Sequence, residues 1–250
     1  MINPDSHVTK SGRKIAYRKT QGTGPGVVFL GGFKSDMEGT KAVYLEEWAQ
    51  DTGRAFLRFD YSGHGTSSGA FEDGCIGDWA DDAQEIIEQL SEGPQILVGS
   101  SMGGWIALLM AKRIPEKIAG LVGIAAAPDF TEDSMWASFT DEHKEILMAK
   151  GQLALENDYS DDPYVITRKL IEDGRNQLVL RDALNLPFPV RLLHGTADVD
   201  VDLAVPLQIL DHASGDDMRL MLVKGADHRF SEPENLAMIR RAVHSVTMRA

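Results

Sequence analysis

Short apolar runs alternate with longer segments of helical period along most of the chain. Apolar runs bounded by glycine, proline or aspartate predict strands at 27–30, 55–59, 96–98, 118–126, 190–193 and 219–223. Runs this short and continuous are typical of strands buried on both faces of a parallel sheet. Helices are predicted between them at 37–50, 76–90, 102–113, 203–210 and 232–248. The alternation indicates an α/β fold with a mostly parallel central sheet flanked by helices.

Two segments depart from this alternation. Residues 7–20 mix polar and apolar positions, which predicts an antiparallel hairpin at the edge of the sheet. Residues 128–186 contain no convincing buried strand and predict a helical insertion, which we expect to form a lid over a substrate pocket. The alternative is a surface excursion packed by its own apolar residues, which include Met135, Trp136, Phe139, Leu147, Met148, Leu153, Leu155, Tyr159, Tyr164 and Ile166.

Composition and charge narrow the class of protein. The chain has 250 residues, of which 43% are hydrophobic, and this is enough for the core of a single domain over residues 1–250. The formal net charge of −13 opposes binding to phosphate backbones, so nucleic acid is not an expected partner. The predicted partner is a small-molecule substrate. The sequence does not distinguish a monomer from a homodimer.

Features that report on compartment point to the cytoplasm. No apolar stretch approaches the length of a membrane span, so no integral membrane association is expected. The N-terminus lacks a basic region followed by an apolar run, so no secretory signal is expected. The single cysteine, Cys75, excludes an intrachain disulfide and is interpreted as incidental rather than nucleophilic.

The segment after the predicted strand at 96–98 carries the first chemical signal. Gly99-Ser100-Ser101-Met102-Gly103 fits the pattern Gly-x-Ser-x-Gly between a buried strand and a helix. The glycines are needed because the turn is so sharp that side chains at the flanking positions would clash. The turn lifts the Ser101 hydroxyl clear of the sheet, at the positive end of a helix. Ser101 is therefore the candidate nucleophile, and Ser100 is interpreted as structural.

A serine nucleophile needs a base, and the base needs an acid that orients it. In chains with this motif, the order is nucleophile, acid, histidine. His228 lies in the loop after the strand at 219–223, from which it can reach back over the sheet edge to Ser101. Asp198, after the strand at 190–193, is the predicted acid, and Asp200 and Asp202 are alternatives. The predicted triad is Ser101, Asp198 and His228.

The other histidines are assigned structural or surface positions. His194 is expected to brace a loop at a strand end, and His64 to lie in a loop near the pocket. No paired cysteine or histidine spacing typical of a metal site is present, so neither a metal nor a cofactor is expected. Polar or helical surroundings predict surface positions for His7, His143, His212 and His244.

Acyl transfer also needs donors for the oxyanion that develops in the transition state. We expect the backbone N–H of Met102, directly after Ser101, to be one donor. The other is expected from the loop 30–36, where Gly31 and Gly32 let the backbone turn its amides inward, and this indicates the N–H of Phe33. The same glycines do not fit a dinucleotide-binding motif, because the later glycine is missing.

Together these motifs resemble the α/β-hydrolase superfamily along nearly the whole chain. A closer resemblance, to a mitochondrial branch of palmitoyl-protein thioesterases and acyl-glucuronide esterases, rests on the blocks 39–42, 58–63, 93–101, 103–105, 191–195 and 227–229. It implies that Ser101, Asp198 and His228 act as a catalytic triad. The N-terminal targeting region of that branch has no counterpart here, so a bacterial or processed relative is expected. The 128–186 segment matches least well, which leaves the substrate open.

The predicted function is hydrolysis of a carboxylic ester or an acyl-thioester through an acyl-enzyme intermediate. A small-molecule ester or thioester, or an acylated protein, is the expected substrate. One alternative is a C–C bond hydrolase or lactonase on the same scaffold. Another is a non-catalytic binding protein that kept the fold, and the intact order of triad residues argues against it. A haloalkane dehalogenase is excluded, because that chemistry needs a carboxylate where Ser101 stands.

Overall fold

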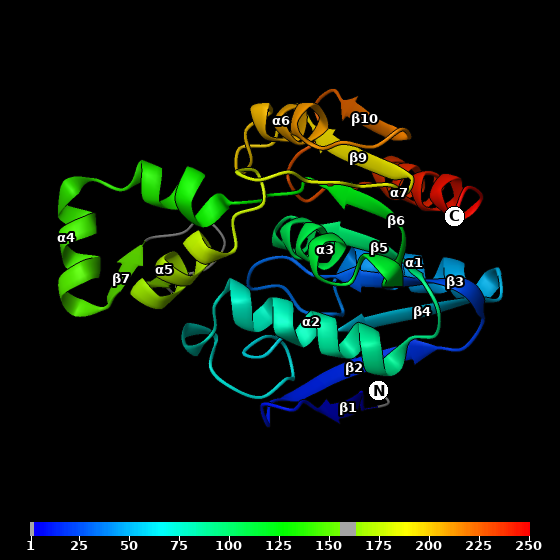
Figure 1. The fold of residues 1–250 in the computed structure, drawn as a ribbon, viewed down its shortest axis with the longest axis horizontal. Helices are drawn as coiled ribbons and strands as arrows, with labels where there is room; N and C mark the ends of the chain where they lie inside the picture. The colour runs from blue at the N-terminus through cyan, green and yellow to red at the C-terminus, as the bar shows by residue number, and fades with distance from the viewer. Residues whose placement is uncertain (1–2, 156–163) are drawn as a thin grey trace.

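The centre of the protein is a mixed β-sheet. In the computed structural model, which describes residues 3–155 and 164–250, eight strands form this sheet in the order β1-β2-β4-β3-β5-β6-β9-β10 (Figure 1). Tyr159 lies outside the described residues. The strands are β1 (Asp5–Val8), β2 (Lys14–Thr20), β3 (Thr23–Leu30), β4 (Arg54–Phe59), β5 (Gln95–Ser100), β6 (Ile118–Ile124), β9 (Val190–Gly195) and β10 (Met218–Val223).

Strand direction divides the sheet into two parts. The hairpin β1–β2 lies at one edge and pairs antiparallel with β4, whereas β4, β3, β5, β6, β9 and β10 pair parallel to one another. Parallel strands end at the same edge, so the loops after β3, β5, β9 and β10 gather on one side of the sheet. The mostly parallel sheet and the edge hairpin predicted from the sequence are confirmed.

Helices cover both faces of the sheet. α1 (Thr40–Asp51) and α7 (Pro233–Thr247) pack on one face, where Leu45 and Val243 are buried with Val98 of β5. α2 (Ile76–Leu90) and α3 (Met102–Arg113) cover the other face, and their side chains Trp79 and Trp105 are fully buried. α6 (Ala204–His212) lies beside β10 (Figure 1). None of the described helices is long and apolar enough to cross a membrane.

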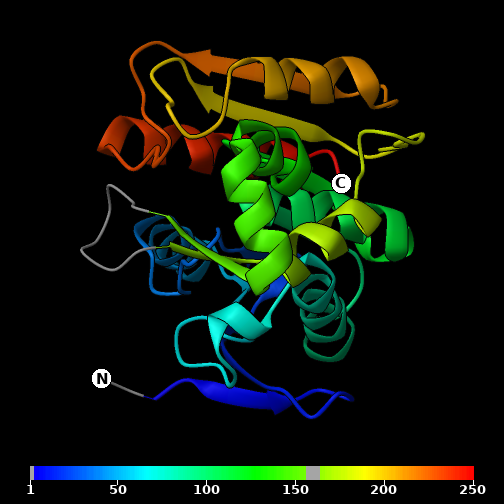
Figure 2. The same cartoon turned by 90° about the vertical axis from the view of Figure 1, so that its left-hand side faces the viewer.

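The segment between β6 and β9 stands apart from the sheet. It contains the π-helix η3 (Thr131–Trp136), α4 (Asp141–Lys150) and α5 (Arg168–Asn176). It projects to one side in Figure 1 and faces the viewer in Figure 2. The helical insertion predicted here also contains strands. β7 (Gln152–Leu155) and β8 (Tyr164–Thr167) form a small antiparallel pair of their own. Each of these two strands has four residues, and buried positions alternate with more exposed ones. They therefore lack the continuous apolar pattern of a central strand.

The bounds of other elements differ from the prediction for local reasons. α1 begins at Thr40 rather than at residue 37, because the Met37 N–H donates to a buried Asp60 carboxylate at 2.6 Å. β6 ends at Ile124, since Ala125 takes a left-handed backbone with φ 45°. β10 is an edge strand with partly exposed side chains, not a strand buried on both faces. The short helices η1 and η2 cover Phe71–Asp73 and Pro115–Lys117.

Candidate active site

Ser101 lies at the sharp turn between β5 and α3. Its φ of 53° and ψ of −118° form a conformation that residues other than glycine rarely adopt. The Ser101 N–H donates to the Ile124 carbonyl at 2.9 Å, which fixes the turn against β6. A Cβ at Gly99 would lie 2.3 Å from the Gly103 carbonyl oxygen, and a Cβ at Gly103 would lie 2.0 Å from the Leu30 carbonyl oxygen. The two glycines therefore allow the turn for the steric reason predicted.

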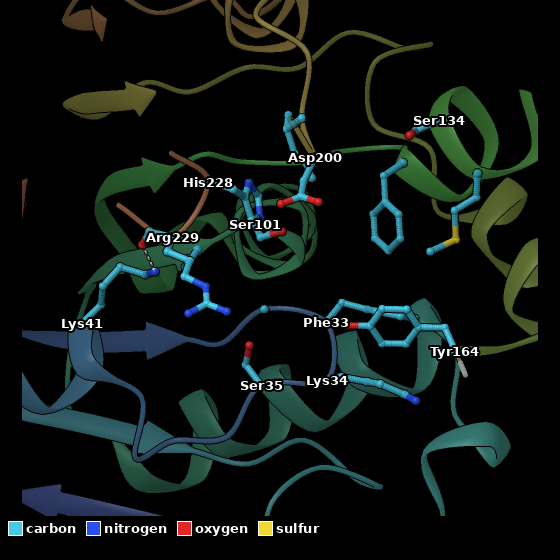
Figure 3. Close-up of a pocket in the computed structure, with 16 residues that line it drawn as sticks. Phe33, Lys34, Ser35, Lys41, Ser101, Ser134, Tyr164, Asp200, His228 and Arg229 are labelled. Carbon is cyan, nitrogen blue, oxygen red and sulfur yellow. Dashed lines mark hydrogen bonds between the residues drawn. The ribbon is translucent and has the colours of Figure 1, made fainter. Parts of the chain in front are cut away.

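The side chains of Ser101, His228 and Asp198 form a continuous hydrogen-bonded row. The Ser101 Oγ lies 3.1 Å from His228 Nε2, and His228 Nδ1 lies 2.8 Å from Asp198 Oδ2. Figure 3 shows the side chains of Ser101 and His228 pointing toward one another. In the tautomer that suits both contacts, the Nδ1–H donates to the carboxylate and Nε2 accepts from the hydroxyl. This order lets the imidazole take the hydroxyl proton while the carboxylate stabilises the resulting charge.

The Asp198 carboxylate is held ionised and in place by its loop. Its side chain is fully buried, and its Oδ1 accepts the N–H groups of Asp200 and Val201, each at 2.9 Å. Burial raises the pKa of Asp198, but the hydrogen bonds from His228 and from these amides outweigh it, so the pKa lies below its ordinary value. An ionised carboxylate at this point suits the orientation of His228.

The loops that carry Asp198 and His228 pack tightly together. Gly195, at the end of β9, faces the Ala226 carbonyl oxygen, which would lie 2.1 Å from a Cβ at this position. The Ala197 N–H also donates to the Ala226 carbonyl at 3.0 Å. This close approach brings two loops from neighbouring strands into register and sets the distance between the acid and the histidine.

The alternative acids occupy different places. Asp202 is exposed, and its Oδ1 accepts the Ala204 N–H at 2.7 Å at the start of α6. Asp200 is also exposed and lines the cavity beside Ser101. Ligand atoms of Asp198, Asp200 and His228 lie within 4.8 Å of one another, a spacing that a metal ion could use. The Asp198 and His228 atoms are already bonded to each other, however, so the geometry favours the triad over a metal centre.

The two amides expected to bind an oxyanion are suitably unpaired. Met102 is the first residue of α3, where N–H groups have no partner within the helix. Among the described residues, neither the Met102 N–H nor the Phe33 N–H has a hydrogen-bond acceptor. Phe33 lies in the loop after β3, and both Phe33 and Ser101 line the same cavity. The arrangement leaves both amides available to an anionic oxygen.

A cavity of about 490 Å³ lies next to Ser101, and Figure 3 shows the side chains that line it. One side is apolar and includes Phe33, Phe130, Met135 and Tyr164. The Phe33 ring packs against Phe130 and Tyr164 with centroid distances of 5.6 Å and 6.2 Å. Residues of η3 and β8 thus complete a wall that begins in the loop after β3. The 128–186 segment contributes directly to the cavity in front of Ser101.

The remaining candidates lie outside this row. His194 Nε2 lies 3.1 Å from the Val201 carbonyl oxygen, to which it donates, in keeping with a bracing role, and burial lowers its pKa. His64 is buried with its ring edge-on to Phe71 and Trp79 and does not line the described cavity. The lone thiol, Cys75, is buried, and burial raises its pKa to about 12, which opposes a nucleophilic role.

The surface positions predicted for four histidines are confirmed only in part. His244 is exposed, whereas His7, His143 and His212 are partly buried.

The sequence did not single out the basic residues that line the cavity. Lys34, Lys41 and Arg229 line it, together with Ser35. Arg229 directly follows His228 in the chain, and this adjacency could have indicated that Arg229 lies near the cavity. Lys41 enters from the start of α1, and no local pattern connects it with His228.

The chain is similar to known proteins over most of its length. The family described as "alpha/beta hydrolase fold" matches residues 28–172. The chain belongs to this α/β-hydrolase family. The fold class and the resemblance drawn from the sequence are confirmed.

Individual relatives within the α/β-hydrolases cover nearly the whole chain. Rat palmitoyl-protein thioesterase ABHD10, mitochondrial, is 38% identical over 226 residues, which cover 90% of this chain and 76% of the relative. A crystal structure of a putative hydrolase from Agrobacterium vitis S4 has a TM-score of 0.93, with 36% identity over 98% of this chain and 99% of that chain. Alpha/beta hydrolase domain-containing protein 10 from mouse has a TM-score of 0.90, with 33% identity and coverage of 98% of both chains. The ABHD10 relatives are mitochondrial by name, so the cytoplasmic location of this chain stays a prediction.

Proposed function

We propose that this protein is a serine hydrolase that cleaves carboxylic esters or acyl-thioesters, with Ser101, His228 and Asp198 as its catalytic triad. The observation that carries the proposal is the row of hydrogen bonds from Ser101 Oγ to His228 Nε2 and from His228 Nδ1 to Asp198. The relatives named palmitoyl-protein thioesterases support an acyl-thioester among the substrates. An acylated protein and a small acyl-thioester both fit this class.

The proposed reaction has two steps. His228 takes the proton of Ser101 as the Oγ attacks the acyl carbonyl, and it then donates that proton to the departing alcohol or thiol. The resulting acyl-enzyme reacts with water, which His228 deprotonates in the same way. The free acid leaves and the Ser101 hydroxyl is restored. Asp198 stays ionised throughout and stabilises the imidazolium that forms twice.

The negative charge that develops on the carbonyl oxygen needs donors in place before the reaction begins. The N–H groups of Met102 and Phe33 are the proposed oxyanion donors, because they lack other acceptors among the described residues and flank Ser101. Removal of one donor from such a site typically costs a factor of about 10²–10³ in kcat. The strained backbone at Ser101 helps by keeping its Oγ and the following amide on the same side.

The 128–186 segment is proposed to be a lid within a single domain of residues 1–250. Phe130 and Met135 at its beginning and Tyr164 of β8 line the cavity, where they cover the apolar side next to Ser101. A wall of this kind binds an acyl chain and keeps bulk water from the acyl-enzyme. The segment therefore selects the acyl group, while the sheet loops carry the chemistry.

Hydrolysis of p-nitrophenyl butyrate and of S-butyryl-N-acetylcysteamine tests the proposal. The wild-type protein is expected to hydrolyse both, and Ser101→Ala is expected to lower kcat/KM by about 10³-fold or more. Ser100→Ala is the matched control, because Ser100 ends β5 and, among the described residues, has no hydrogen bond to His228. Turnover by Ser101→Ala at the wild-type rate would overturn the proposal.

A further inference from the structure

The charges around the cavity differ from those of the chain as a whole. The chain has 38 acidic and 25 basic residues. Among the described residues that line the cavity, however, the cations Lys34, Lys41 and Arg229 outnumber the acidic side chain, Asp200. A cleft lined by one sign of charge concentrates ligands of the opposite sign. Although the protein is acidic overall, the basic side chains in this cavity favour the binding of an anion beside Ser101.

Lys41 is the cation most firmly built into the site. Its ammonium donates to the backbone carbonyl of Arg229, a residue 188 positions away in the chain (Figure 3). One acceptor uses one of the three N–H donors of a lysine. Burial lowers the pKa of Lys41 to about 8, although the nearby Asp227 opposes this shift and Arg229 adds to it. Lys41 thus holds a positive charge in the wall of the cavity, partly withdrawn from water, and has donors left for a ligand.

The direction of the reaction decides which part of the substrate meets Lys41. In acyl transfer, the histidine gives its proton to the leaving-group atom, so this atom must lie beside His228 Nε2. Arg229 is the next residue in the chain, and Lys41 is bonded to its backbone. Figure 3 shows Lys41 and Arg229 on one side of Ser101 and the rings of Phe33 and Tyr164 on the other. The leaving group therefore extends toward the cations, and the acyl chain extends toward the rings.

We propose that Lys41 and Arg229, with the Ser35 hydroxyl, form a leaving-group subsite that binds a carboxylate or phosphate carried by the alcohol or thiol. This rests on the proposed function, since it takes Ser101 and His228 as nucleophile and base. The preferred substrates are then esters or thioesters that join an apolar acyl chain to an anionic leaving group. Carboxylate and phosphate share the chemistry that the subsite recognises, namely negative oxygens that accept N–H and O–H hydrogen bonds.

Three octanoyl thioesters with different thiols test this subsite. The thiols are neutral N-acetylcysteamine, mercaptopropionate with a carboxylate, and mercaptoethyl phosphate. The wild-type protein is expected to show a kcat/KM about tenfold higher for at least one anionic thioester than for the neutral one, as one charge-assisted hydrogen bond allows. The comparison of the two anions identifies the preferred group. The preference is expected to shrink as ionic strength rises, because salt screens the attraction.

Variants of Lys41 separate a binding role from a structural one. Lys41→Met is expected to lower kcat/KM about tenfold more for the preferred anionic thioester than for the neutral one, and Lys41→Arg to restore most of the preference. Lys112→Met is the matched control, because Lys112 is exposed in the last turn of α3 and should leave the rates on all three thioesters unchanged.

The possible failures are distinguishable. A wild-type protein that hydrolyses neutral and anionic thioesters equally well, while Ser101→Ala is inactive, would overturn the subsite and leave the proposed function standing. An equal loss on all three thioesters in Lys41→Met would also overturn it, because Lys41 would then only position the histidine loop. If Ser101→Ala hydrolyses the neutral thioester like the wild type, the proposed function itself fails.

Discussion

The Nδ1 atom of His228 lies 2.8 Å from the Asp198 carboxylate, which is fully buried and also accepts two backbone N–H groups. The two residues come from loops after neighbouring strands, and these loops contact each other through Gly195 and Ala226. The geometry of the candidate base is therefore set by the sheet and not by the histidine loop alone. A change at Asp198 should consequently affect the orientation of His228 more than the fold.

We expect Asp198→Asn to lower kcat by about 10³–10⁴-fold, because an amide in this position favours the wrong imidazole tautomer. The matched control is Asp202→Asn, since Asp202 is exposed and, among its described hydrogen bonds, its side chain accepts only the Ala204 N–H. Ester hydrolysis by both variants, with circular dichroism to confirm folding, checks the expectation. A greater loss in Asp202→Asn than in Asp198→Asn would show that Asp198 is not the acid.

Gly103→Ala should destabilise the protein, because the new Cβ would lie 2.0 Å from the Leu30 carbonyl oxygen. Because the atoms nearest to this Cβ are backbone atoms, the clash can be relieved only by a shift of β3 or α3. The expected loss in the free energy of unfolding is more than about 2 kcal/mol. Gly31→Ala is the control, because a Cβ at Gly31 meets no atom within 4 Å and should cost less than about 1 kcal/mol. Urea denaturation of both variants measures the difference, and equal stabilities would contradict the steric account.

His64 should make the stability depend on pH in a defined window. Burial lowers its pKa to about 4 from the ordinary 6.5, with the Ser62 carbonyl opposing the shift and Lys34 adding to it. Between these values the unfolded chain binds a proton and the folded protein does not. The free energy of unfolding therefore falls as pH drops from 6.5 to about 4, by up to about 3 kcal/mol from this group.

The variant His64→Phe isolates this contribution. The ring of residue 64 lies among Tyr61, Phe71 and Trp79, so phenylalanine suits the space and removes the titration. Denaturant midpoints measured at several values of pH should fall less steeply for the variant than for the wild type on acidification. Parallel curves for the two proteins would show that His64 is protonated as easily in the folded state as in the unfolded one.

Local signals explain which parts of the site could be predicted from the sequence. The turn at Ser101 is determined by Gly99 and Gly103 within a few residues, and the positions of Asp198 and His228 follow from their places after β9 and β10. These features depend on strand order and chain proximity, which the alternation of apolar runs reveals. The meeting of Ser101, His228 and Asp198 in one hydrogen-bonded row could therefore be predicted from motif and strand order alone.

Features that depend on distant contacts could not be predicted in this way. Lys41 reaches the cavity only because α1 packs beside the loop of Arg229. The strands β7 and β8 pair with each other across residues outside the described part of the chain, and their runs of four residues give too weak a signal. The sequence consequently indicated which side chains form the hydrogen-bonded row from Ser101 to Asp198, but not which residues shape the pocket.

Covalent labelling of Ser101 tests the central claim most directly. A fluorophosphonate probe reacts with a serine only where a base and oxyanion donors activate it. We predict stoichiometric labelling of the wild-type protein, with the adduct located by mass spectrometry on the peptide that contains Ser101, and no labelling of Ser101→Ala. A wild-type protein that stays unlabelled, or an adduct at another residue, would contradict the account.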